Sequence, residues 1–359
     1  MKRSRLTLFF GLVLSFFTVV VACAQTPPKT TKPPRNLAIL IFDGVQIIDY
    51  TGPYETFGHT YSNDSEAFNI YTVSEKTNAI TTSMGMSVNP KYSFENAPKA
   101  DLLLVPGGDV RAQVDSPTVI KWIQKTAGDA EIVMSVCNGA FIIAKAGLLD
   151  GMEATTTAGL IPMLRQDAPK VKVVDDRRFV DNGRIITTAG LSSGIDGALH
   201  VIERLYGKGT AQMAALGMEY NWDPDSKFVR AMLADKYMRF NYDVKVVEGG
   251  WKPLSRTGSV DSWENTWAVI TESSANELLD QINNSIAANK TYGPALAKWT
   301  RATMEPTKNT LQTWWTFTDE KGSPWNGVVQ VTPVAGQKNQ YTLSVKVSRN
   351  MARTTAGAL

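Results

Sequence analysis

The chain has 359 residues, of which 43% are apolar and 20% charged, a normal mixture for a globular protein with room for two domains. The formal net charge of +3 rests on Lys2, Arg3 and Arg5, which lie in an acid-free N-terminal segment typical of a removed leader. Without that segment, 34 basic residues face 34 acidic ones. Such a chain lacks the basic surface that nucleic acids need, so we predict no nucleic-acid partner.

Residues 1–23 are predicted to be a signal peptide, with MKRSR as its basic start and LTLFFGLVLSFFTVVV as its apolar stretch. Val20-Val21-Ala22-Cys23 resembles a bacterial lipobox that would place a lipid on Cys23, whereas Ala22-Cys23-Ala24 fits ordinary signal peptidase. The proline-rich spacer over residues 24–35 favours the lipoprotein, and a soluble periplasmic or secreted protein is the alternative. We therefore predict an exported bacterial protein, periplasmic or anchored to the envelope.

Strand-like and helix-like patterns alternate from residue 36 onward. Unbroken apolar runs typical of buried parallel strands cover 37–42, 68–73, 101–106 and 131–136, and two more strands lie between 171 and 188. The predicted helices are one opened by Gly52-Pro53, one over 116–127 with Ser116 as N-cap, one after Asn138, and one over 192–207. This alternation predicts an α/β domain over 36–224 with a doubly wound, mostly parallel, flavodoxin-like sheet.

The pattern changes after residue 225, where we predict a connecting helix over 225–244 and a smaller α+β domain over 245–350. Seven of the nine tryptophans lie from Trp251 onward, and 341–348 alternates like a half-buried antiparallel strand. The tryptophans are open to two interpretations, a carbohydrate- or envelope-binding surface and a packed core. In a domain of about a hundred residues the core is favoured.

The heptapeptide SVCNGAF places Cys137 at the break between a strand and a helix. A tight turn of this kind lifts a side chain above the carboxyl end of a parallel sheet, where ligands bind. The following helix N-terminus is expected to give the thiol thiolate character. Apart from Cys23 the chain has no other cysteine to pair with. Cys137 is therefore either a nucleophile on an elbow like that of G-x-S-x-G or a buried packing thiol.

Two further features favour a site. Gly107-Gly108 ends another strand, and the N–H groups of Gly108 and Asn138 are candidate oxyanion-hole donors, unless the glycines only make a turn. Asp49 follows an apolar run and is either a helix cap or a site acid whose pKa burial would raise. Glu55 and Leu191 are accessory candidates.

Four stretches resemble the ThiJ/PfpI superfamily: IFDGVQIIDYTGPYE, LLLVPGG, SVCNGAFIIAKAGLLDG and ITTAGLSSGIDGALHVIERLYG. The resemblance covers residues 36–222 and implies the class I glutamine amidotransferase-like fold. It also implies a cysteine nucleophile at Cys137, an acid at Asp49 that touches it, and a homodimer with the sites near the interface. Within the superfamily the likeness is to isocyanide hydratases and to the amidase-like domains of some AraC-type regulators.

Many relatives carry a histidine at a position that Thr157 occupies here. The chain has two histidines, His59 and His200, and both are predicted to be structural or surface residues. A Cys-His-acid triad is therefore not supported, which weakens amidotransferase, protease and glyoxalase-like functions. Isocyanide hydratases use a thiol with an aspartate and do not depend on that histidine. Asn138 stands where those relatives usually carry threonine, which leaves the substrate open.

We predict a cysteine-dependent hydro-lyase or hydrolase, isocyanide hydratase-like, that acts on a small electrophilic carbon without a metal or other cofactor. The alternative is a non-catalytic, lipid-anchored binding module or a thiol redox sensor. AraC-type relatives have a basic helix-turn-helix tail, whereas from Lys245 onward this chain has twelve basic and nine acidic residues. Together with the export signal, this makes transcriptional control a disfavoured function.

Overall fold

The computed structural model describes residues 33–62, 65–238, 240–288, 297–302 and 311–350. The predicted signal peptide, Cys23 and most of the spacer lie outside these residues, so export and lipidation stay predictions. Within the described ranges, no helix is both long enough and apolar enough to cross a membrane.

Seven strands form the central sheet of the first domain, in the order β12-β13-β9-β8-β1-β4-β7. All neighbouring pairs are parallel except β12 and β13. The predicted doubly wound, mostly parallel sheet is thereby confirmed. The strands are β1 (Arg35–Leu40), β4 (Phe68–Ser74), β7 (Tyr92–Ser93), β8 (Leu102–Val105), β9 (Ile132–Ser135), β12 (Phe179–Asp181) and β13 (Ile185–Thr188).

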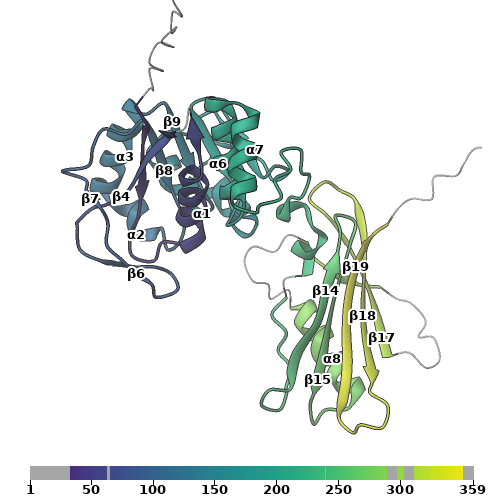
Figure 1. The fold of residues 1–359 in the computed structure, drawn as a ribbon. Helices are drawn as coiled ribbons and strands as arrows, with labels where there is room; N and C mark the ends of the chain where they lie inside the picture. Colours follow the sequence, from purple (N-terminus) through teal and green to yellow (C-terminus); the bar gives the residue numbers. More distant parts are fainter. Residues whose placement is uncertain (1–32, 63–64, 239, 289–296, 303–310, 351–359) are drawn as a thin grey trace, which may run out of the picture. The chain divides into compact units, whose positions relative to one another are not determined.

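Helices flank this sheet on both sides, as Figure 1 shows. Strands β8 and β9 are buried along their whole length, which explains their unbroken apolar sequences. The helices are α1 (Ile47–Gly58), α2 (Arg111–Asp115), α3 (Pro117–Asp129), α4 (Gly139–Lys145), α5 (Ile161–Asp167), α6 (Ser193–Tyr206) and α7 (Lys208–Gly217). The short elements are β2 (Tyr61–Ser62), β3 (Ser65–Glu66), β5 (Ile80–Thr81), β6 (Ser87–Val88), β10 (Glu153–Ala154), β11 (Lys172–Val173) and the 3-10 helix η1 (Ala158–Leu160).

Helix α1 begins at Ile47 rather than at Gly52, so the predicted start is wrong and Pro53 lies inside the helix. Asp49 therefore stands in the first turn of α1 and not before it. Close packing on α6 accounts for the longer helix, because a Cβ at Gly52 would lie 3.1 Å from Ile195 Cγ1. This packing offsets the backbone hydrogen bond that Pro53 cannot donate.

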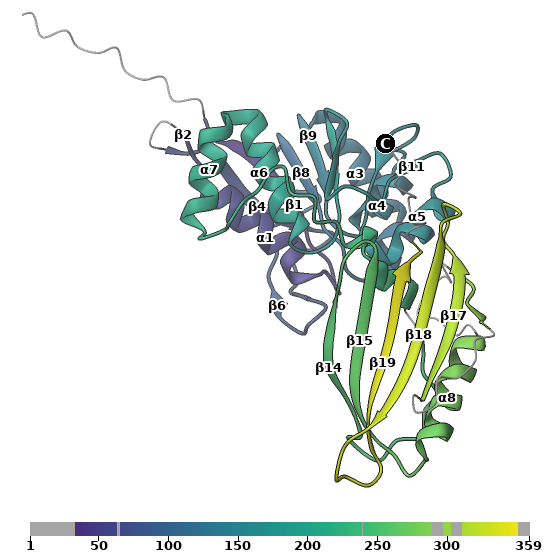
Figure 2. The same cartoon turned by 90° about the vertical axis from the view of Figure 1, so that its right-hand side faces the viewer.

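The second domain is a six-stranded antiparallel sheet in the order β14-β15-β19-β18-β17-β16, with helix α8 packed on β17 and β18. Figure 2 shows the helix lying along this sheet. A sheet covered by one helix confirms the predicted α+β class. The elements are β14 (Trp251–Gly258), β15 (Ser262–Ile270), α8 (Ala275–Ala287), β16 (Thr300–Arg301), β17 (Leu311–Thr318), β18 (Pro324–Pro333) and β19 (Gln340–Arg349).

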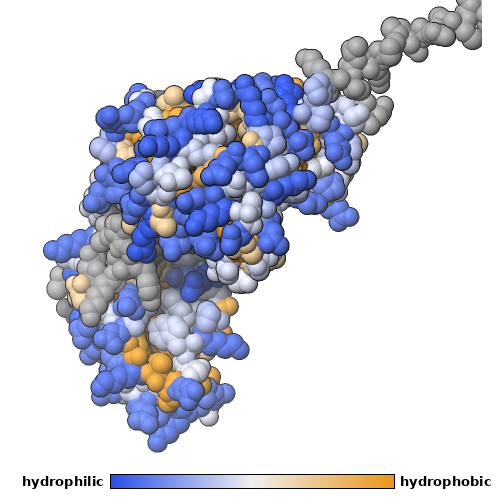
Figure 3. All heavy atoms as spheres, turned by 90° about the vertical axis from the view of Figure 1, so that its left-hand side faces the viewer, coloured by the Kyte–Doolittle hydropathy of each residue, from blue (hydrophilic) through white to orange (hydrophobic). Residues whose placement is uncertain are grey.

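Alternate residues of these strands are buried and form a second hydrophobic core. Strand β19 shows the alternating burial that the sequence predicted over 341–348. Five tryptophans belong to it and are at most 9% exposed, which supports packing rather than a surface role for them: Trp263, Trp267, Trp299, Trp315 and Trp325. Figure 3 shows apolar residues gathered on part of this domain's surface. Its exposed large apolar residues are Val246, Val247, Leu254, Val260 and Ile270.

The predicted connecting helix over 225–244 is wrong. The described residues of this range instead contain two 3-10 helices, η2 (Arg230–Met232) and η3 (Ala234–Met238), separated by Leu233 in an extended conformation. The Ala234 N–H donates to the Ser259 carbonyl oxygen at 3.0 Å. Contacts of η3 with the second sheet thus outweigh the local sequence pattern that predicted a helix.

Gly139 lets the start of α4 approach the end of β8. A Cβ at this position would lie 2.2 Å from the carbonyl oxygen of Val105. Gly139→Ala is therefore expected to destabilise the protein by about 1–3 kcal/mol, because the backbone segments must move apart. Urea unfolding followed by circular dichroism measures the change.

Gly209→Ala is the matched control. Gly209 lies in α7, and a Cβ there would have no atom within 4 Å. Alanine is favoured over glycine in a helix by about 1 kcal/mol, so this variant should be as stable as the wild type or slightly more stable. A Gly139→Ala protein as stable as the wild type would contradict the close approach.

Candidate active site

Cys137 occupies a strained turn between β9 and α4. Its backbone φ is 57°, in the left-handed region that L residues rarely adopt. The turn is held from both sides, since the Cys137 N–H donates to the Ala189 carbonyl at 3.1 Å and the Cys137 carbonyl accepts from Thr156 Oγ1 at 2.8 Å. The sequence-based expectation of an elbow at the carboxyl end of the sheet is confirmed.

Asp49 is fully buried and lies within hydrogen-bond reach of the Cys137 side chain. Its carboxylate also accepts two backbone N–H groups, from Gly107 to Oδ2 at 3.2 Å and from Leu191 to Oδ1 at 3.2 Å. Leu191, an accessory candidate, has a φ of 55° and contributes this N–H, while its side chain is 48% exposed. Helix α1 and the segments after β8, β9 and β13 therefore converge on one carboxylate.

Burial is the main influence on both acidic groups. It raises the pKa of Asp49 to about 6, against the hydrogen bonds from Cys137, Gly107 and Leu191. Burial and the charge of Asp49 raise the pKa of Cys137 to about 12. At neutral pH the site thus holds a neutral thiol that donates to an ionised carboxylate. The expected thiolate is wrong, because burial and the neighbouring negative charge outweigh the helix terminus.

The glycine turn after β8 contacts Asn138, the residue after Cys137, so it lies at the same edge of the sheet, as predicted. The Gly108 N–H donates to Asn138 Oδ1 at 2.8 Å, and Asn138 Nδ2 donates back to the Gly108 carbonyl at 2.8 Å. The Gly107 N–H donates to Asp49 Oδ2 at 3.2 Å, and the Asn138 N–H acts to lower the pKa of the Cys137 thiol. Of the two amides proposed as an oxyanion hole, that of Gly108 is therefore occupied within the protein.

Thr157, at the place of the absent histidine, hydrogen-bonds to the Cys137 side chain. Gly190 borders both residues, because a Cβ there would lie 2.6 Å from Thr157 Oγ1 and 3.6 Å from Cys137 Sγ. The sequence analysis did not identify Thr156 or Gly190 as site residues. A glycine shortly after the ITT strand could have pointed to Gly190, but the sequence does not show that this strand lies beside β9.

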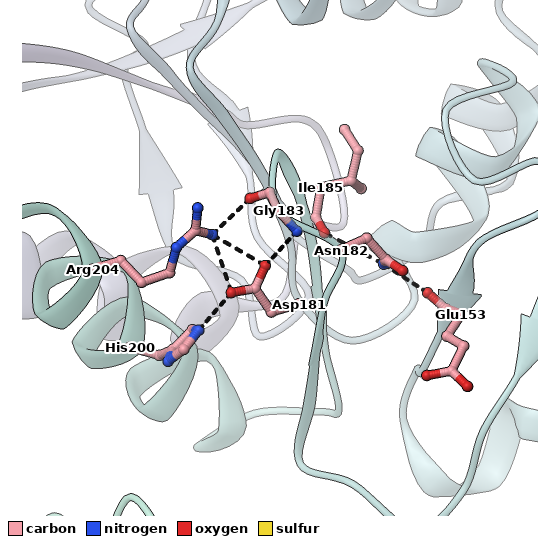
Figure 4. Close-up of polar contacts among 7 residues, drawn as sticks. All are labelled: Glu153, Asp181, Asn182, Gly183, Ile185, His200 and Arg204. Atoms are coloured by element: carbon pink, nitrogen blue, oxygen red, sulfur yellow. Dashed lines mark hydrogen bonds and ion pairs between the residues drawn. The ribbon is translucent and has the colours of Figure 1, made fainter.

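Both histidines pair with carboxylates outside this site. His59 Nε2 lies 3.1 Å from the exposed carboxylate of Glu55, so that accessory candidate has no contact that ties it to the thiol. His200 Nε2 lies 2.8 Å from Asp181 Oδ2, and Arg204 Nη1 lies 3.1 Å from both oxygens of that carboxylate. Figure 4 shows this group joining α6 to the β12–β13 turn.

No cluster of three or more histidine, cysteine, aspartate or glutamate side chains in the described ranges could hold a metal. A cavity of about 210 Å³ lies beside Thr157 and Gly190. It is lined by Thr155–Ala158, Arg177, Arg178, Ala189–Ser193 and Phe228–Ala231, and its lining residues do not include Cys137 or Asp49. Arg178 is paired with the buried carboxylate of Asp196 and so offers the cavity little free charge.

The DJ-1/PfpI family model matches residues 35–204. Isonitrile hydratase from Pseudomonas putida is 33% identical over 189 residues, which cover 52% of this chain and 78% of that protein. The HTH-type transcriptional regulator CdhR from Pseudomonas aeruginosa is 26% identical over 173 residues, covering 48% of this chain and 51% of the regulator.

Among solved structures, a ThiJ/PfpI family protein from Pseudomonas syringae has 25% identity and a TM-score of 0.49, covering 57% of this chain and 86% of that one. Drosophila melanogaster DJ-1beta has 19% identity and a TM-score of 0.47, and the match covers 53% of this chain and 100% of that one. The family match ends at residue 204, before the second domain begins. The homodimer that the resemblance implies stays a prediction, since a single chain is described.

Asp49→Asn is expected to make Cys137 more reactive toward iodoacetamide at neutral pH. The carboxylate raises the thiol pKa by its charge and by its hydrogen bond. Its removal should therefore move the pH profile of alkylation about one unit or more toward lower pH. Mass spectrometry of the protein without its predicted leader measures the rate at each pH.

Asp109→Asn is the control, because it removes a carboxylate that is 73% exposed beside the same glycine turn. This variant should keep the wild-type profile, and Cys137→Ser gives the background. An unchanged or raised thiol pKa in Asp49→Asn would show that the carboxylate does not act on the thiol.

The raised pKa of Asp49 also makes stability depend on pH. The carboxyl has an ordinary pKa of 3.8 and a folded value of about 6, so between them the folded state binds more protons than the unfolded state. The free energy of unfolding should therefore fall by roughly 2 kcal/mol from this group as the pH rises from about 4 to about 6. Urea unfolding across this window should show a smaller fall for Asp49→Asn, and an equal fall would contradict a buried charge.

Proposed function

We propose, from the premise that this chain belongs to the DJ-1/PfpI family, that it hydrates a small isocyanide to an N-substituted formamide through Cys137 and Asp49. The observation that carries the proposal is the buried hydrogen bond between the two side chains, with no imidazole beside them. The 33% identical relative named isonitrile hydratase supports the same reaction class.

The first half of the reaction uses the single proton that the pair shares. The Cys137 thiol gives its proton to Asp49 as the sulfur attacks the terminal isocyanide carbon and a C–S bond forms. Asp49, whose pKa of about 6 suits both directions of transfer, then protonates that carbon. The product is a thioimidate on Cys137, and Asp49 is again ionised.

The second half consumes one water. Asp49 takes a proton from the water as its oxygen bonds to the thioimidate carbon, and it passes that proton to the nitrogen. The tetrahedral intermediate then forms a C=O bond and its C–S bond breaks, while the hydroxyl proton returns through Asp49 to the sulfur. The formamide leaves and the neutral thiol is restored.

The occupied Gly108 amide favours this reaction over acyl transfer. Hydrolysis of an amide or ester places negative charge on an oxygen, which an oxyanion hole of free N–H groups must stabilise. The Gly108 N–H donates to Asn138 Oδ1 instead. Addition to an isocyanide develops charge on carbon and nitrogen, which a proton from Asp49 neutralises directly.

The second candidate is a non-catalytic binding module. Two observations favour it. The raised pKa of Cys137 lowers the fraction of nucleophilic thiolate, and the occupied Gly108 N–H is not free to stabilise a charged intermediate. Relatives that are named transcriptional regulators are 24–26% identical over about half of this chain. Turnover dependent on Cys137 separates the two functions.

The protein without its predicted leader should convert para-nitrophenyl isocyanide to the formamide, with one oxygen taken from ¹⁸O-labelled water. Cys137→Ser should abolish turnover, and Asp49→Asn should lower kcat about a hundredfold or more because the proton relay is lost. Mass spectrometry of the product gives both rate and label.

Glu55→Gln removes an exposed carboxylate of the same helix and should keep wild-type activity. Turnover that survives in Cys137→Ser, or a wild-type protein that hydrates no isocyanide, would reject the hydratase.

A further inference from the structure

The second domain contains a cavity of about 720 Å³ that is separate from Cys137. The residues that line it come from η2, η3, the chain between η3 and β14, and strands β14 and β15. Its volume falls in the range of cavities that hold small organic ligands.

Three aromatic rings form one wall of this cavity. The ring centroids lie 5.5 Å apart for Trp251 and Trp267, 5.7 Å for Tyr242 and Trp267, and 6.0 Å for Tyr242 and Trp251. Trp267 is anchored in the core at 4% exposure, while Trp251 is only partly buried. The wall therefore offers aromatic surface to a flat apolar group.

The polar groups beside this wall are donors. Arg256 lies directly across from Asn265 in the β14–β15 pair, and in the described part of the chain its guanidinium makes no hydrogen bond or ion pair. Asn265 Oδ1 is occupied by the Trp263 indole N–H at 3.0 Å, which leaves its amide N–H groups for another partner. The Asp235 carboxylate, which also borders the cavity, is paired with Arg230.

Tyr242 links the wall to the cation. Its hydroxyl is buried and has no hydrogen-bond partner within the described residues. Arg256 lines the same cavity as Tyr242. A buried hydroxyl without a partner and a guanidinium that border one cavity are an arrangement that an anionic acceptor would complete.

We propose that this cavity binds a small organic carboxylate with an aromatic body, its ring against Trp251 and Trp267 and its carboxylate on Arg256. A carboxylate matches the guanidinium and the Asn265 amide, which are both donors. Val246, one of the exposed apolar residues of this domain, also lines the cavity and favours an apolar body. The site does not depend on the reaction proposed for Cys137.

Calorimetric titration of the protein without its predicted leader uses two probes, 1-naphthaleneacetate and its neutral analogue 1-naphthaleneacetamide. The acid should bind at least about tenfold more tightly than the amide, because only the acid pairs with Arg256. Arg256→Gln should weaken binding of the acid by about tenfold or more and leave the amide unchanged. Arg256 is exposed, so this variant is expected to fold, and circular dichroism verifies it.

Lys252→Gln is the matched control, because it removes a positive charge from the same strand on the opposite face of the sheet. It should bind both probes like the wild type. Equal affinity for acid and amide, an Arg256→Gln protein that binds the acid normally, or no saturable binding of the acid at millimolar concentration would each overturn the proposal.

Discussion

The hydrogen bond between the buried carboxylate of Asp49 and the thiol of Cys137 is the contact around which the first domain's sheet edge is arranged. An isolated charge in such a position would be costly, and backbone N–H groups from Gly107 and Leu191 make it tolerable. Each donor stands just after a different strand. Gly107 must be glycine, since a Cβ there would lie 2.1 Å from Asn138 Oδ1. The acid is thus held by backbone, and the thiol by a strained turn.

This arrangement keeps one proton between the two side chains, so the site does not hold a free thiolate. The pKa values of about 6 and about 12 place that proton on sulfur at neutral pH, with the ionised Asp49 carboxylate as its neighbour. A neutral thiol reacts slowly with oxidants and with chance electrophiles, because the thiolate is the reactive form. That property weighs against the redox-sensor alternative.

Much of the fold was predictable from the sequence because its signals are local. Unbroken apolar runs predicted buried parallel strands, and the alternation over 341–348 predicted the antiparallel strand of the second domain. The predicted helix start at Gly52-Pro53 was wrong, because packing on α6 outweighs the preference of proline for the first turn of a helix. The connecting helix failed for a similar reason, because contacts with the second sheet determine the conformation around Ala234.

The site was only partly predictable. Parallel strands bring their carboxyl ends together, so Cys137, Asp49 and the glycine turn could be grouped in advance. Strand order and hydrogen-bond partners depend on tertiary structure, and so the contact of Gly190 and the occupied N–H of Gly108 were not foreseen. The thiol pKa was predicted in the wrong direction because burial and the charge of Asp49 are properties of the folded site.

The most direct measurement of the central claim is the infrared S–H stretching band of Cys137, taken as the difference between the wild type and Cys137→Ser. That band falls in a spectral region with little other protein absorption and reports the thiol itself. The account predicts an S–H band at neutral pH that is shifted by a hydrogen bond to Asp49, and a change of frequency in Asp49→Asn. Absence of the band at neutral pH, with a protonated carboxyl signal in its place, would contradict the account by placing the proton on Asp49 and the charge on sulfur.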